Sequence, residues 1–120
     1  VAGVVEGEVS DVAGPVRVMN VPPGKVTIRP ATATNGIVLV RWDALRDLQN
    51  NPVRDLARYT VSRREKQDLT GETEQLFPVG PEMTEFYDTT ATAETTYVYR
   101  VQAVDFIHEG PWSDTVEVTP

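Results

Sequence analysis

The side chains with the most chemical potential in this sequence lie close together near its C-terminal end. They are Asp105, His108, Glu109 and Asp114. Carboxylates and an imidazole can bind a metal ion, or they can transfer protons when an oriented partner lies within hydrogen-bond reach. The spacing matches no established ligand pattern, and His108 is the only histidine of the chain. The alternative, which we favour, is a polar loop before the last strand, with no metal and no cofactor.

Nucleophiles and phosphate-binding loops are poorly represented. Ser10 and Ser113 each lie shortly after a glycine, but neither stands in the pattern Gly-x-Ser-x-Gly. The chain has no cysteine, which excludes disulfides, thiolate metal sites and cysteine nucleophiles. It also has no glycine-rich phosphate loop. We therefore assign no catalytic residue and predict that the chain is not an enzyme.

Basic residues form one cluster along the sequence. They are Arg58, Arg63, Arg64 and Lys66. Such a cluster could bind a sulfated or acidic sugar, and Arg58, Arg63 and Arg64 are the candidates for that role. The alternative is cross-strand pairing with glutamates such as Glu72, Glu74 or Glu85. The formal net charge of −7 favours pairing, and it argues against nucleic acid or an anionic membrane as a partner.

Apolar residues in two expected loops are the third candidate site. They are Leu45, Leu48, Val53, Phe106 and Ile107. If these loops lie at the same end of the fold, the side chains form an apolar patch that contacts a partner or a neighbouring domain. The alternative is that they pack beneath their own loops. Trp112 has the same two interpretations, because it can close the core or contact a ligand.

Alternation of apolar and polar residues, rather than helical spacing, dominates the chain and predicts strands with one buried face. The alternation is clearest in four stretches: residues 38–42, 59–62, 97–104 and 115–119. Asn35-Gly36 predicts a hairpin turn between strands at 26–34 and 37–42. Residues 44–57 are expected to form a long loop, because Pro52 interrupts their helix-forming composition. Short strands at this spacing favour a β-sandwich or a barrel.

These residues together resemble the fibronectin type III domain over residues 23–120. Trp42 matches the family's second-strand tryptophan, and Tyr97 matches its tyrosine corner, whose hydroxyl bonds back to upstream backbone. The most specific segment is 97–105 followed by Gly110-Pro-Trp-Ser113. The resemblance implies an all-β, seven-stranded antiparallel Greek-key β-sandwich. The core residues that it implies are Trp42, Tyr59, Val61, Tyr97, Tyr99 and Val101.

One position departs from the family pattern. Ala91 stands six residues before the corner tyrosine, where the family usually has a core leucine. A smaller side chain leaves a void unless neighbouring side chains fill it. We expect Phe86 or Leu76 to fill this space.

Residues 1–22 are additional to the length that one such sandwich needs, and part of them repeats a sequence found near the C-terminus. Glu6-Gly-Glu-Val-Ser-Asp11 matches Glu109-Gly-Pro-Trp-Ser-Asp114 at four of six positions. Because internal repeats indicate modular architecture, we interpret residues 1–22 as the last strand of a preceding similar domain with its linker. The alternative is a simple N-terminal extension. The chain begins with Val1 and no signal segment follows, as in a mature chain or a piece of a longer one.

The expected function follows from the resemblance. It implies a non-catalytic spacer or protein-interaction module in a larger surface-exposed or secreted protein, such as a bacterial lipoprotein. The expected location is extracellular, at the cell surface or periplasmic, and no membrane-spanning segment is expected. Expected partners are neighbouring domains and a protein or carbohydrate ligand bound through the end loops. The alternative is an accessory domain of a carbohydrate-active enzyme or of a ligand-binding receptor. The family's adhesive Arg-Gly-Asp tripeptide is absent.

Overall fold

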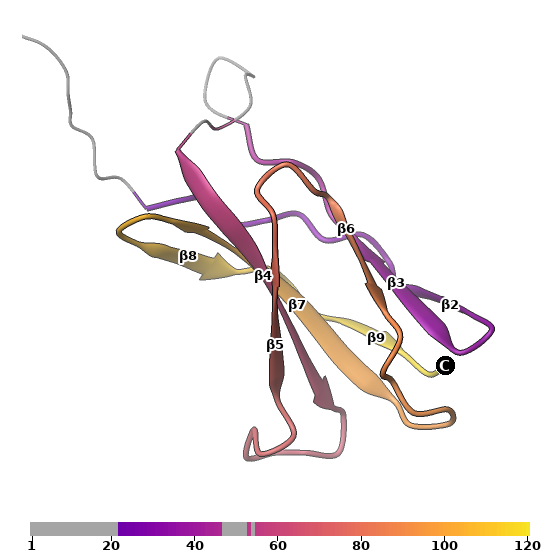
Figure 1. Cartoon of the computed structure of the whole chain (residues 1–120). Helices are drawn as coiled ribbons and strands as arrows, with labels where there is room; N and C mark the ends of the chain where they lie inside the picture. The colour runs from indigo at the N-terminus through magenta and orange to yellow at the C-terminus, as the bar shows by residue number, and fades with distance from the viewer. Residues whose placement is uncertain (1–21, 47–52, 54) are drawn as a thin grey trace, which may run out of the picture.

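The computed structural model describes residues 22–46, 53 and 55–120. Within these residues the protein is all-β, and two antiparallel sheets pack face to face (Figure 1). The described part contains no helix that is long and apolar enough to cross a membrane.

The smaller sheet has three strands in the order β2-β3-β6. Its strands are β2 (Thr32–Thr34), β3 (Ile37–Arg41) and β6 (Glu85–Asp88). The predicted hairpin turn joins β2 and β3, and Asn35 and Gly36 both have positive φ values, 54° and 80°. Left-handed backbone at both positions is what a tight hairpin turn requires, and Asn and Gly are the residues that tolerate it.

The larger sheet has five strands, ordered β5-β4-β7-β8, with β9 also paired to β7. Its strands are β4 (Leu56–Glu65), β5 (Gln75–Val79), β7 (Tyr97–Asp105), β8 (Glu109–Trp112) and β9 (Val116–Val118). Within the described residues there are eight strands rather than the seven expected, because the last expected strand is divided into β8 and β9. Residues 109–111 belong to β8 rather than to the expected loop, so that expectation is wrong. Ser113 lies between β8 and β9, and its hydroxyl accepts a hydrogen bond from the Val101 amide at 2.9 Å.

Alternate residues of the central strands fill the space between the sheets. Val38, Val40 and Trp42 are buried, and the Trp42 ring lies 5.3 Å from the Tyr59 ring, measured between centroids. The other buried apolar residues of this core are Val26, Leu56, Val61, Tyr97, Tyr99, Val101 and Ala103. All six core residues named from the sequence lie within it.

Of the two side chains expected to compensate for the small Ala91, only Phe86 packs against the core. Its ring centroid lies 4.9 Å from that of Phe77. Leu76 is 58% exposed, so the expectation that it fills the void is wrong. In the register of β5, Leu76 and Phe77 point to opposite faces of the sheet, and Phe77 takes the inward one.

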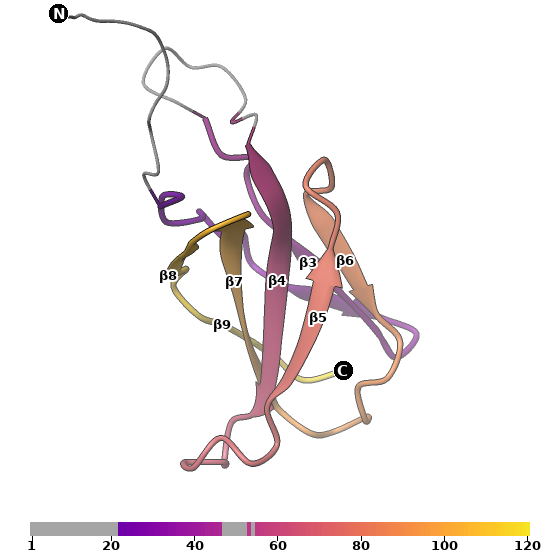
Figure 2. The same ribbon diagram turned by 60° about the vertical axis from the view of Figure 1, so that its left-hand side comes forward.

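The two ends of the sandwich carry different segments (Figure 2). At one end, the N-terminal end, the described chain begins and the β5–β6 and β7–β8 loops lie. At the other, the C-terminal end, lie the β4–β5 and β6–β7 loops.

Candidate functional site

The β7–β8 hairpin presents two large apolar side chains to solvent. Phe106 is 81% exposed and Ile107 is 67% exposed, and together we call them the hairpin tip. The Asp105 carboxylate holds the turn, because it accepts hydrogen bonds from the amides of Ile107, at 2.7 Å, and His108. The Asp105 amide also donates to the His108 carbonyl at 2.9 Å. The tip is thus presented on a closed, locally bonded turn.

The same hydrogen bonds act on the protonation of Asp105. The amide of His108, followed by that of Ile107, stabilises the charged carboxylate and lowers the pKa of Asp105 despite its desolvation. The His108 ring nitrogen Nδ1 lies 3.4 Å from the second carboxylate oxygen. Asp105 and His108 therefore act as structural residues of the turn.

The expected metal or acid–base cluster is not assembled as a unit. Asp105 and His108 are adjacent, but the Asp114 carboxylate pairs with Lys25 at 2.8 Å, and the Glu109 side chain is exposed. Across residues 22–46, 53 and 55–120, no group of three or more His, Asp or Glu side chains is arranged to hold a metal ion.

The other members of the expected apolar patch have different surroundings. Leu45 packs against the core, and its amide donates to the Tyr59 hydroxyl at 3.3 Å. Val53 is half-buried, and its amide donates to the Leu45 carbonyl. Leu48 lies outside the described residues. In the described part, the exposed members of the patch are those of the hairpin tip.

Trp112 is half-buried at the end of β8 and lies against a charge. The Arg100 guanidinium of neighbouring β7 sits over its ring, 4.1 Å from the centroid. The same guanidinium reaches Glu74 at 3.2 Å. Cation–π stacking of this kind contributes about 0.5–1 kcal/mol at exposed sites. Trp112 is therefore engaged with its own sheet.

Arg63, expected in a basic surface cluster, lies inside the protein. Arg63 is 6% exposed. Its guanidinium donates hydrogen bonds to Asp88 and Thr90, both at 2.8 Å, and to Gln75 at 2.9 Å. The guanidinium carbon also stands over the Tyr97 ring, 4.8 Å from its centroid. This position contradicts the sugar-binding role considered for Arg63.

Asp88 is the anionic partner and is 1% exposed. Burial alone raises its pKa, but hydrogen bonds from Tyr99, Arg63 and Thr90 outweigh burial and lower the pKa overall. The Tyr99 hydroxyl donates to Asp88 at 2.6 Å, and burial together with this bond raises the pKa of Tyr99 well above its usual value. We call Arg63, Asp88 and Tyr99 the buried charge network. Its role is to join β4, β6 and β7 across the two sheets.

The sequence contains a signal for this network. Arg63 follows Tyr59 and Val61 at alternate positions of one strand, which places all three on the inward face. In the same way, Asp88 alternates with Phe86. The alternation predicts an inward ion pair, although only the register of the strands shows that the two charges meet.

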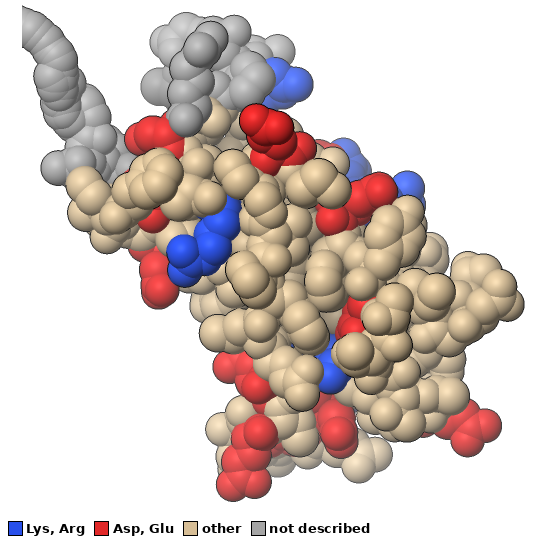
Figure 3. Space-filling model, viewed as in Figure 1, with Lys and Arg blue, Asp and Glu red and all other residues tan. Residues whose placement is uncertain are grey.

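The remaining basic residues of the expected cluster do not form one patch. Lys66 pairs with Glu117 at 3.1 Å, and Arg64 donates to the Asp68 carbonyl at 3.1 Å. On the face shown in Figure 3, basic side chains are scattered among neutral ones. Glu74, an expected partner of basic side chains on this sheet, pairs with Arg100. This arrangement offers no concentrated anion-binding surface on that face.

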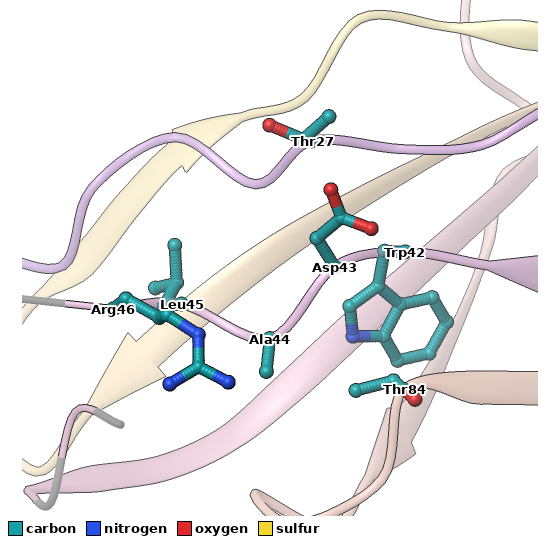
Figure 4. A pocket seen from close by; sticks show the side chains of 7 residues that line it. All are labelled: Thr27, Trp42, Asp43, Ala44, Leu45, Arg46 and Thr84. Carbon is teal, nitrogen blue, oxygen red and sulfur yellow. The ribbon is translucent and has the colours of Figure 1, made fainter. Parts of the chain in front are cut away.

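A pocket of about 600 Å³ lies beside the core tryptophan (Figure 4). Its lining residues are Thr27, Trp42, Asp43, Ala44, Leu45, Arg46 and Thr84. The Trp42 indole nitrogen faces the Ala44 side of this pocket and is buried without a hydrogen-bond partner. The Asp43 carboxylate is held by Arg29 through two hydrogen bonds, of 2.9 and 2.7 Å. Among the described residues that line the pocket, Asp43 is the carboxylate, and its pairing with Arg29 leaves it poorly suited to act as a general base.

Known proteins match this chain through structure. No family model matches its sequence, and no curated protein matches it. The third fibronectin type III domain of human KIAA0343 superposes with a TM-score of 0.67 at 15% identity, over 89% of this chain and 90% of that one.

Two further structures agree with this match. The FN1–FN3 domains of chicken CNTN1 give a TM-score of 0.64 at 19% identity, over 85% of this chain and 35% of that one. A redesigned β-sandwich protein gives 0.57 at 20% identity, over 84% of this chain and 95% of that one. The chain has the fibronectin type III fold.

Proposed function

We propose that this chain is a non-catalytic module that spaces and contacts neighbouring domains in a larger surface-exposed or secreted protein. The observation that carries the proposal is the hairpin tip. Phe106 and Ile107 are exposed together on a turn whose backbone is fixed by Asp105. Fully burying each side chain contributes about 1.5–3 kcal/mol, so a preformed turn with two such groups suits a small protein contact.

The proposed domain boundaries support a modular role. We assign residues 23–120 to the sandwich and residues 1–22 to the last strand and linker of a preceding domain. The echo between 6–11 and 109–114 supports this assignment. Modular chains of this kind fit an extracellular, cell-surface or periplasmic location.

The alternative is an accessory domain of a carbohydrate-active enzyme or of a ligand-binding receptor. A sugar-binding face needs aromatic rings arranged in a row along one surface. The strongly exposed aromatics of the described part, Tyr87 and Phe106, lie on β6 and at the hairpin tip, on different elements. This separation favours a protein contact.

Calorimetric titration of the chain with the other domains of its parent protein tests the proposal. We expect binding that is weakened at least tenfold by Phe106→Ser with Ile107→Ser. Leu69→Ser is the matched control, because Leu69 is 93% exposed but lies in the β4–β5 loop. Equal binding by the wild type and the double variant would remove the hairpin tip from the function. Binding of soluble oligosaccharides instead would support the alternative.

A further inference from the structure

The start of the sandwich is locked against β8. Pro23 is buried, and a methyl group added at Gly110 would lie 2.8 Å from the Pro23 carbonyl oxygen and 3.2 Å from its Cβ. Contacts this short leave room only for glycine at position 110. The backbone at Pro23 is therefore held directly on the β7–β8 hairpin.

This attachment places the first described residues of the chain beside the β7–β8 hairpin. Gly110 follows Ile107 by three positions along the same hairpin. Figures 1 and 2 show, from two directions, that the first described residues lie next to β8. The direction of chain attachment and the exposed apolar side chains thus share one end of the fold.

The sequence echo sets the length of the connection. Val16 and Val18 alternate around Arg17 as Val116 and Val118 alternate around Glu117, so we place the last strand of the preceding domain there. Residues 19–22 then connect that strand to the buried Pro23. An extended residue spans about 3.3–3.6 Å, so four residues reach about 14 Å at most. Pro22 followed by Pro23 also restricts its backbone.

We propose that the hairpin tip docks onto the C-terminal end of a preceding sandwich domain in the same chain, so that the two domains form one rigid unit. This inference rests on the modular function proposed above and specifies its partner. A short linker keeps the partner at a millimolar effective concentration, so a small contact suffices. Domains otherwise move relative to one another unless an apolar interface fixes them.

The chain itself shows what such a partner surface contains. Its own C-terminal end carries Leu69 in the β4–β5 loop, and this side chain is 93% exposed. A preceding domain of the same kind presents its corresponding end to the hairpin tip. Apolar side chains at both ends of one fold are suited to contact between successive copies.

The test compares the 120-residue chain with a chain extended upstream through the preceding domain of the parent reading frame. Amide ¹⁵N relaxation gives a tumbling time for each domain. We expect one common tumbling time and altered chemical shifts at Phe106 and Ile107 in the longer chain. Phe106→Ser with Ile107→Ser should release the domains to tumble separately, whereas Leu69→Ser should not. Thermal unfolding of each variant checks that both domains remain folded.

The contradicting outcomes are distinguishable. If the upstream sequence forms no β-sandwich, the modular assignment of residues 1–22 fails, and the docking fails with it. If the upstream sandwich folds but tumbles independently, with unchanged shifts at the hairpin tip, only the docking is wrong. Independent tumbling together with binding of the tip to another domain would leave the proposed function in place.

Discussion

Two regions of this protein invert the usual placement of side chains. The buried charge network puts Arg63 at 6% exposure in the interior, whereas the hairpin tip puts Phe106 at 81% exposure in solvent. Arg63 is stable inside because its guanidinium meets Asp88, Thr90 and Gln75. Phe106 has no comparable set of partners at the end of its hairpin.

The comparison separates structural residues from functional ones. A buried charge that is paired within the fold is hidden from partners, and removal of its counter-ion destabilises the fold. An exposed apolar side chain on a fixed turn contributes little to its own domain and remains available for contact. We therefore expect substitutions in the network to reduce stability, and substitutions at the tip to reduce association.

The largest effect is expected from Asp88→Ala, because it leaves the Arg63 guanidinium buried without its counter-ion. Breaking a buried pair in this way costs about 3–5 kcal/mol of unfolding free energy. Urea unfolding at neutral pH measures the loss. Asp43→Ala is the control, because its pair with Arg29 is half-exposed and is expected to contribute about 1 kcal/mol or less. Equal effects from the two substitutions would show that burial of the network is energetically unimportant.

Acid should weaken the fold through the same aspartate. The pKa of Asp88 is lower in the folded protein than in the unfolded chain, where it is about 3.9. The stabilisation is therefore complete above the unfolded value and is lost as pH falls through the folded one. We expect unfolding free energy to be level from about pH 7 to 5 and to decline below about pH 4. The pKa values of Asp68 and Asp105 are also lowered, so they add to the decline.

The contribution of Asp88 to this decline can be isolated. Asp88→Asn should flatten the acid limb relative to the wild type, whereas Asp55→Asn at an exposed position should leave its slope unchanged. If the free energy of unfolding of Asp88→Asn declined with acid as steeply as that of the wild type, the acid sensitivity would come from the turns that contain Asp68 and Asp105.

Gly110→Ala should lower stability by a smaller amount, about 1–3 kcal/mol. The added methyl group meets the backbone oxygens of Pro23 and Ala103 at 2.8 and 2.9 Å, and neither can rotate away. Gly24→Ala is the control, because nothing lies within 4 Å of its added methyl group. Thermal unfolding compares the two variants. A melting temperature for Gly110→Ala equal to that of the control would mean that Pro23 is not held against β8.

Tyr97→Phe should cost about 0.5–1.5 kcal/mol, the value of one hydrogen bond. The Tyr97 hydroxyl accepts a hydrogen bond from the Thr92 amide at 2.9 Å, which is the upstream backbone bond expected at this corner. Tyr87→Phe serves as control, because the Tyr87 side chain is 57% exposed. Hydrogen exchange at Thr92 gives a second reading, and protection that persists in Tyr97→Phe would contradict the role of this bond.

The sequence predicts local features of this fold better than the contacts between distant segments. Alternation and the Asn35-Gly36 turn are local, and they correctly predict antiparallel strands and the β2–β3 hairpin. The choice of a sandwich over a barrel came from the resemblance to the fibronectin type III domain. The pairing of Arg63 with Asp88 depends on how β4 and β6 face each other across two sheets, which no local pattern encodes. The break between β8 and β9 was missed for a similar reason. The Ser113 hydroxyl, rather than a regular ladder, meets the Val101 amide there.

The candidate site shows the same limit. The position of Phe106 and Ile107 before the last strand predicts a loop, and the Asp105 turn presents both side chains to solvent. The sequence left open whether Leu45 is exposed or packs inward, because its packing depends on the position of the Tyr59 hydroxyl on another strand. Which apolar loop residues remain exposed is therefore decided by tertiary contacts.

The smallest expected effect on stability comes from Phe106→Ser with Ile107→Ser in the isolated chain. Surface substitutions away from caps and buried groups change unfolding free energy by about 0.5 kcal/mol or less. The Asp105 hydrogen bonds that form the turn involve backbone amides and survive the change. Urea unfolding of the 120-residue chain measures this effect. A loss of several kcal/mol would mean that the tip packs on its own domain, and the contrast between network and tip would then fail.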